Sequence, residues 1–277
     1  MTLNKLSRIM VFILLLGLAT VFLLPIIIVA VNAFKFKFSI TSSPFALPNS
    51  ESFSGFENFI NGINQTDFWG AFFYSLFITT FSVAVIIVFS SMTAWYIVRA
   101  KSFLTNIVYY SLVFSMIVPF QMVMFTMSKV ANILRFDNPV GIIFIYLGFG
   151  AGLSVFMFSG FVKSVPKTVE EAATIDGCNT LQTYFLVVFP ILKPTTVTVA
   201  ILNTMWIWND YLLPYLVIGN DYKTIPVAVQ YLKGGYGSVD MGALMALLVL
   251  SILPVIIFYL LGQKYIIKGV AAGAVKG

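Results

Sequence analysis

Six long apolar stretches, separated by short charged segments, restrict the fold of this chain more than any other feature. A helix that crosses the bilayer needs about 20 largely apolar residues, whereas the strands of a membrane barrel need only about 9–11 and alternate in polarity. We therefore expect an all-α integral membrane protein with six transmembrane helices. The expected spans are, approximately, residues 9–34, 70–98, 103–127, 139–162, 191–218 and 242–263.

Composition excludes the common soluble classes. Of the 277 residues, 60% are hydrophobic and 9% are charged, against about 45–50% and about 25% in typical soluble domains. A soluble enzyme, a nucleic-acid-binding module and a disordered chain are all poor interpretations of such a sequence. We treat residues 1–277 as a single transmembrane domain.

Several kinds of catalytic and metal site are absent from the sequence. Cys178 is the one cysteine and the chain has no histidine, so an internal disulfide, a cysteine-cluster metal site and a Ser-His-Asp triad are excluded. The G-x-x-x-x-G-K-[ST] phosphate loop is also absent. We expect no metal and no cofactor in this chain, and no enzyme activity of its own.

The distribution of basic residues predicts the orientation, because cytoplasmic loops of membrane proteins carry an excess of Lys and Arg. With a cytoplasmic N-terminus, ten Lys and Arg fall inside and six outside, where six acids offset them. Both termini are therefore expected in the cytoplasm, and the net charge of +6 signals topology rather than nucleic-acid binding. Residues 35–67 form the largest extracytoplasmic loop.

The first span resembles a secretory signal peptide in its basic start, but its apolar run far exceeds the usual 7–15 residues. We therefore keep it as a span. No internal repeat is visible, which weakens an interpretation as a carrier built from two repeated halves.

The cytoplasmic segment 163–190 has the local signals of two short helices joined at a corner. Pro166 suits the opening of a helix, Thr168 and Glu171 have capping-box spacing, and Gly177 suits a C-terminal stop. Asn179 and Gln182 then offer a second N-cap. Such an elbow is suited to docking, and an ordinary amphipathic connector in the membrane interface is the alternative.

The elbow also resembles a known signature. Glu171-Ala172-Ala173, then Gly177, then Val187, Phe189 and Pro190 reproduce the spacing of the EAA loop of binding-protein-dependent ABC importer permeases, with Val187 and Phe189 as conservative departures. In that family the loop is a coupling helix that fits into a cleft on the ATPase subunit. The resemblance implies the following ATPase contacts: Glu170, Glu171, Ala172, Ala173, Asp176 and Gly177.

Further residues resemble the carbohydrate branch of that family, and in particular the second, six-span permease subunit of maltose-type and multiple-sugar importers. They are Pro119 with Gln121, Asn138 with Gly141, Trp208-Asn209, the stretch Phe56–Phe59 and the C-terminal ending. The resemblance implies a heterodimer with a second homologous permease, a cytoplasmic ATPase dimer that binds ATP and Mg, an extracytoplasmic solute-binding protein and a sugar substrate. It also implies that Gly273, Lys276 and Gly277 reach the ATPase.

Asp210 is the one acidic residue within the six expected spans. Carboxylates inside membranes are costly and usually face a protein interior or a wet cavity. Asp210 therefore either lines a substrate path or outer gate, or pairs structurally with a neighbouring helix. Gln121, Trp208, Asn209 and Tyr211 are the accompanying candidates for the path, although helix packing and the interfacial aromatic belt also account for them.

The alternative to an importer is a proton-coupled secondary carrier that uses Asp210 and needs no ATPase. A membrane enzyme is a weaker alternative, because one carboxylate without a histidine or a cysteine partner offers few groups for acid–base catalysis.

Overall fold

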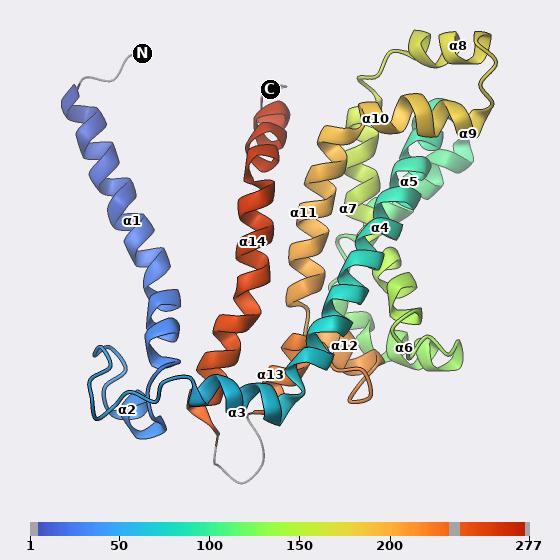
Figure 1. Ribbon diagram of the computed structural model, residues 1–277. Helices are drawn as coiled ribbons and strands as arrows, with labels where there is room; N and C mark the ends of the chain where they lie inside the picture. Colours follow the sequence, from blue (N-terminus) through green and yellow to red (C-terminus); the bar gives the residue numbers. More distant parts are fainter. Residues whose placement is uncertain (1–4, 233–238, 275–277) are drawn as a thin grey trace. The chain divides into compact units, whose positions relative to one another are not determined.

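The computed structural model describes residues 5–232 and 239–274, the last eleven of these as backbone only. The described residues form helices and the segments that connect them (Figure 1). One isolated bridge joins Lys35 and Phe53. The helices are α1 (Lys5–Asn32), α2 (Lys37–Ser42), α3 (Glu57–Thr66), α4 (Phe68–Ala100), α5 (Phe103–Ser115), α6 (Phe120–Ile133), α7 (Gly141–Val162), α8 (Lys167–Ile175), α9 (Thr180–Gln182), the π-helical η1 (Thr183–Val188), α10 (Phe189–Ile191), α11 (Lys193–Asn209), α12 (Leu212–Val217), α13 (Ile225–Tyr231) and α14 (Met241–Ala274).

The chain forms two compact units. One comprises residues 1–69 and 228–254, and the other comprises residues 70–227 and 255–277. The second unit contains the predicted cytoplasmic elbow and the residues around Asp210.

Four helices in the described part of the chain are long and apolar enough to cross a membrane: α1, α4, α7 and α14 as far as Gln263. Two bent pairs raise the number to six if each pair counts as one span. In the first pair α5 and α6 meet at 109°, and in the second the segment Thr180–Ile191 meets α11 at 77°. The expectation of an all-helical membrane protein is confirmed, with four to six candidate spans.

The expected span 103–127 is not one continuous helix in the structure. Helix α5 ends at Ser115 and α6 begins at Phe120, with Pro119 in an extended conformation at the N-cap. Proline lacks the N–H that would continue the helix, and it disfavours helical dihedrals in the residue before it.

A continuous helix over 191–218 was also wrong. Helix α11 ends at Asn209, Asp210 is extended with ψ of 122°, and α12 begins at Leu212. Pro214 lies four residues after Asp210, so an unbroken helix would leave the Asp210 carbonyl without its donor. By contrast, α14 continues as far as Ala274, well beyond the predicted end of the last span at residue 263.

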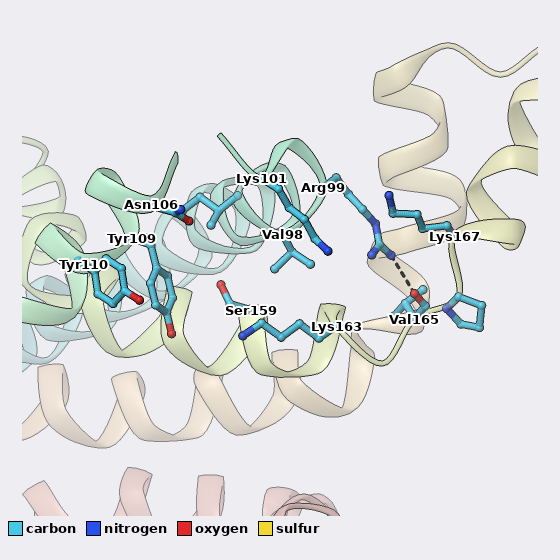
Figure 2. A pocket seen from close by; sticks show the side chains of 12 residues that line it. Val98, Arg99, Lys101, Asn106, Tyr109, Tyr110, Ser159, Lys163, Val165 and Lys167 are labelled. Carbon is cyan, nitrogen blue, oxygen red and sulfur yellow. Dashed lines mark hydrogen bonds between the residues drawn. The ribbon is translucent and has the colours of Figure 1, made fainter. Parts of the chain in front are cut away.

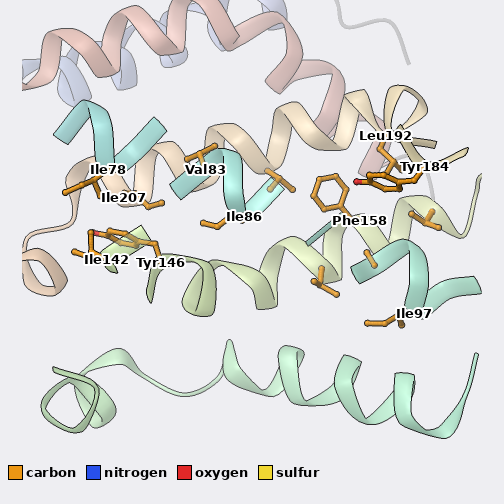
Figure 3. Packing of buried hydrophobic residues seen from close by; sticks show 14 of the residues in the cluster. Ile78, Val83, Ile86, Ile97, Ile142, Tyr146, Phe158, Tyr184, Leu192 and Ile207 are labelled. Atoms are coloured by element: carbon orange, nitrogen blue, oxygen red, sulfur yellow. The ribbon is translucent and has the colours of Figure 1, made fainter. Parts of the chain in front are cut away.

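The core of the second unit joins α4, α7, α11 and η1. Tyr146 lies near Ile142 at one end of this cluster, and Tyr184 lies near Leu192 at the other (Figure 3). All four of these side chains are fully buried. The cluster packs the end of α4 and the segment from Tyr184 to Leu192 within one body.

Two glycines of α7 permit close packing against neighbouring helices. A Cβ at Gly150 would lie 2.6 Å from Ile86 Cδ1, and a Cβ at Gly152 would lie 2.6 Å from the carbonyl oxygen of Leu112. Gly148, by contrast, faces open space. Close approach of neighbouring helices therefore depends on Gly150 and Gly152.

The first unit contains an ordered loop between α1 and α4. The Asn58 side-chain amide donates to the carbonyl oxygens of Ala33 (2.8 Å) and Lys35 (2.9 Å), and so ties α3 to the end of α1. Gly62 of α3 approaches Leu247 of α14, where an added Cβ would meet Leu247 Cγ at 2.9 Å.

Candidate functional site

The elbow of residues 163–190 follows most of its local sequence signals. Pro166 is the N-cap residue of α8, and Gly177 ends the corner with φ of +89°, a conformation that glycine adopts without strain. Asn179 and Gln182 form the predicted capping box, with both hydrogen bonds at 2.9 Å. The predicted box at Thr168 was wrong, because α8 begins at Lys167 and Thr168 is already inside the helix.

Glu170 ties α8 to the end of α4. Arg99 Nη2 donates to Glu170 Oε1 at 2.6 Å, Arg99 Nε donates to the same oxygen at 2.9 Å, and Trp95 Nε1 donates to Oε2 at 3.1 Å. Arg99 Nη2 also donates to the carbonyl oxygen of Val165 at 2.9 Å. Charge-assisted hydrogen bonds of this kind are about twice as strong as neutral ones. The Glu170 side chain therefore contacts this chain's own α4.

The same network continues into η1. The Trp95 ring packs on Tyr184 with centroids 5.4 Å apart, and the Tyr184 hydroxyl shares a hydrogen bond of 2.5 Å with Ser91 Oγ. Trp95 and Tyr184 were not among the predicted site residues, and Arg99 was counted only as a charge that indicates topology. Trp95 and Arg99 are four positions apart in the sequence, which places them on one helical face. That spacing was the signal that could have revealed them.

The outer surface of the elbow presents most of the other predicted contact residues. Glu171, Ala172, Asp176 and Gly177 are exposed, whereas Ala173 is buried. Ile175, which the sequence analysis did not select, is 85% exposed at the end of α8. A groove of about 460 Å³ beside α8 is lined by residues that include Glu171 and Cys178.

Asp210 has structural partners in the second unit. Its Oδ1 accepts from the backbone N–H groups of Leu212 (3.0 Å) and Leu213 (3.4 Å), and its Oδ2 accepts from the Tyr146 hydroxyl (3.1 Å). The carboxylate thus caps the start of α12 and joins it to α7. This geometry agrees with the structural alternative for Asp210.

The other candidates for the path do not share one helical face. Trp208 is buried and packs edge-on against Phe72 at 6.0 Å, whereas Tyr211 stacks on Tyr215 at 5.3 Å. Trp208 and Tyr211 therefore have different neighbours, on either side of the helix break at residue 210.

Two further candidates are exposed side chains. Asn209 is exposed at the end of α11, where its side-chain amide donates to the carbonyl oxygen of Met205 at 2.7 Å. Gln121 is exposed in the first turn of α6.

The predicted C-terminal contact lies at the edge of the described chain. Gly273 belongs to the helical backbone of α14, and Lys276 and Gly277 lie outside the described residues. Among the described residues, no group of three His, Cys, Asp or Glu side chains could hold a metal ion.

Comparison with known proteins assigns the family. Residues 86–272 match the binding-protein-dependent transport system inner membrane component family. The chain belongs to this family. It is a multi-pass permease component of the inner membrane, and the ATPase of such a transporter is a separate subunit.

Relatives of this permease extend over nearly its full length. It is 39% identical to the "Probable starch degradation products transport system permease protein AmyC" of Thermoanaerobacterium thermosulfurigenes, across 94% of this chain and 93% of the relative. It is 35% identical to the "Multiple sugar-binding transport system permease protein MsmG" of Streptococcus mutans, across 92% of each chain.

A solved structure shares the fold of this permease. It is a crystal structure of a bacterial ABC transporter involved in the import of the acidic polysaccharide alginate, matched with a TM-score of 0.73 and 24% identity. The match covers 96% of this chain and 99% of that chain.

Proposed function

We propose that this chain is a permease subunit of an importer for sugars, and in particular for oligosaccharides. The observation that carries the proposal is its 39% identity, over 94% of its length, to a permease named for starch degradation products. The second relative is named for multiple sugars, which favours a sugar class over any one sugar.

We further propose that the chain supplies half of the translocation path, in six spans with both termini in the cytoplasm. A second, homologous permease subunit supplies the other half. A cytoplasmic ATPase dimer and an extracytoplasmic solute-binding protein complete the assembly. The excess of Lys and Arg in the predicted inner segments supports this orientation.

In this account α8 is the coupling helix. Its exposed surface, with Glu171 and the protruding Ile175, enters a cleft on the ATPase, while Glu170 holds the opposite side of α8 to Arg99. When ATP binding closes the ATPase dimer, α8 moves with it. The Arg99–Glu170 bridge carries that motion into α4, and the path opens outward to receive sugar.

The geometry of Asp210 gives no support to the proton-coupled carrier. A carboxylate that carries protons through a transport cycle must exchange them with water or substrate. Asp210 instead accepts hydrogen bonds from two backbone N–H groups and from Tyr146.

The proposal is tested by tagging the chain at its N-terminus, extracting it gently from its native membrane and identifying stoichiometric companions by mass spectrometry. We expect a second multi-span subunit and an ATPase, with a sugar-binding protein in preparations stabilised by substrate. Recovery of the chain alone, active in proteoliposomes driven only by a proton gradient, would overturn the proposal.

A further inference from the structure

A cavity of about 730 Å³ lies where α4 ends, α5 begins and α7 ends, within the second unit (Figure 2). Four of its twelve lining residues are cationic: Arg99, Lys101, Lys163 and Lys167. None of these twelve residues is acidic. The cavity therefore has an excess of positive charge that favours an anion.

Three of the four cations have no acidic partner within the described chain. Arg99 is paired with Glu170, but Lys101, Lys163 and Lys167 form no ion pair with any described residue. Lys101 stands between α4 and α5 in the left-handed region, with φ of +44°. A non-glycine residue adopts this conformation at some cost in backbone strain.

Ser159 adds a buried polar group without a partner. Its side chain is 1% exposed, and its hydroxyl makes no hydrogen bond with any described residue. Figure 2 shows this hydroxyl between Tyr109 and Val98, facing the cavity. A buried polar group left unpaired is destabilising, so a ligand oxygen that accepted from Ser159 would satisfy it.

The apolar surface of α5, the helix that supplies Asn106, Tyr109 and Tyr110 to the cavity, favours a lipid over a soluble anion. Phe103, Leu104 and Ile107, at the start of α5, are exposed and apolar. Tyr109 and Tyr110 line the cavity itself, and tyrosine collects where membrane spans meet water. A headgroup in the cavity would leave its acyl chains beside this apolar surface, which a free phosphate ion would not use.

We propose that this cavity binds the phosphate of an anionic phospholipid, with Lys101, Lys163 and Ser159 as its main contacts. Basic pockets between transmembrane helices bind anionic headgroups in this manner. The site shares Arg99 with the bridge to Glu170, so a bound lipid stabilises the end of α4 beside the elbow. The proposal does not depend on which solute is transported.

The test is lipid binding to the purified full-length chain in neutral detergent, measured by native mass spectrometry with phosphatidylglycerol and with phosphatidylcholine. We expect one saturable phosphatidylglycerol per chain and much weaker phosphatidylcholine binding. The double variant Lys101→Gln/Lys163→Gln should weaken phosphatidylglycerol binding about 25-fold, at about fivefold for each lysine.

The matched control is Lys5→Gln/Lys193→Gln, which removes the same charge from two exposed lysines outside the cavity on the predicted cytoplasmic side. This control should bind phosphatidylglycerol as the native chain does. If the cavity variant elutes as an aggregate, Lys163→Gln alone should still weaken binding about fivefold.

Three outcomes would overturn the proposal. One is equal binding of the two lipids, and another is equal loss of binding in the cavity and control variants. The third is displacement of phosphatidylglycerol by millimolar inorganic phosphate that itself binds the chain as tightly, which would identify a site for soluble anions.

Discussion

Arg99 and Glu170 are 71 residues apart in sequence, yet Arg99 Nη2 lies 2.6 Å from Glu170 Oε1. Both side chains are largely buried, with 17% and 14% of their surfaces exposed. The pair joins the end of α4 to α8, and its neighbour Glu171 remains exposed. Of these two adjacent acids, Glu170 therefore contacts a residue of this chain, whereas Glu171 faces outward.

The first prediction separates these two acids. Glu170→Gln should lower the thermal unfolding midpoint by roughly 5 °C, because the charged partner of a largely buried arginine is lost. Glu171→Gln should leave the midpoint within about 1 °C, because it alters one exposed side chain. Scanning fluorimetry of the purified chain measures both.

A double-mutant cycle with Arg99→Gln checks the origin of the effect. Glu170→Gln should cost much less in the Arg99→Gln background than in the native chain. Equal costs in both backgrounds would contradict a direct Arg99–Glu170 interaction.

The second prediction concerns Asp210. Asp210→Asn should retain sugar uptake in the assembled transporter, because an asparagine oxygen still accepts from the Leu212 N–H and caps α12. Asp210→Ala should lower the unfolding midpoint by more than Asp210→Asn, since it removes the cap. Abolition of uptake by Asp210→Asn in a stably folded assembly would restore the proton-carrier account.

The third prediction tests packing along α7. Gly152→Ala should destabilise the chain, because the new Cβ would meet a backbone oxygen that cannot move away. Gly150→Ala should cost less, because the end of the Ile86 side chain can rotate. Gly148→Ala is the matched control in open space, and it should be neutral or stabilising by up to about 1 kcal/mol. Urea or thermal unfolding that ranked Gly148→Ala as the most damaging would contradict the packing described for α7.

The fourth prediction concerns orientation, with Cys178 as a natural single reporter. A membrane-impermeant maleimide should label Cys178 in inverted vesicles and leave it unlabelled in intact cells. The control, Cys178→Ser with Ser50→Cys in the loop 35–67, should label in intact cells. The reverse pattern would place the elbow outside and refute a cytoplasmic coupling role.

Local chemistry made the elbow predictable from sequence. Pro166, Gly177 and the Asn179–Gln182 box determine the backbone conformation only of residues a few positions away. Their effects on the helix ends can therefore be predicted without knowledge of the fold. The apolar spans were predictable for the same reason, since the bilayer imposes their length.

The breaks in the spans were missed, although each lies near a proline. Pro25 and Pro254 lie inside unbroken helices, whereas Pro119 and Pro214 accompany breaks. Proline alone therefore does not decide the outcome in membrane helices. At the second break, the hydrogen bond from Tyr146 to Asp210 spans 64 residues, and no local pattern reveals it. The Arg99–Glu170 bridge escaped prediction for the same reason.

Site-specific photo-crosslinking tests most directly whether the exposed surface of α8 docks on an ATPase. A benzophenone side chain at Ile175, which protrudes from α8, should crosslink to the ATP-binding subunit in native membranes. The same probe at Phe53, exposed in the predicted outer loop, should not. An ATPase adduct at position 175 alone is the result that the account predicts. Absence of that adduct at position 175 in an assembly that still transports, or its appearance at position 53, would contradict the account.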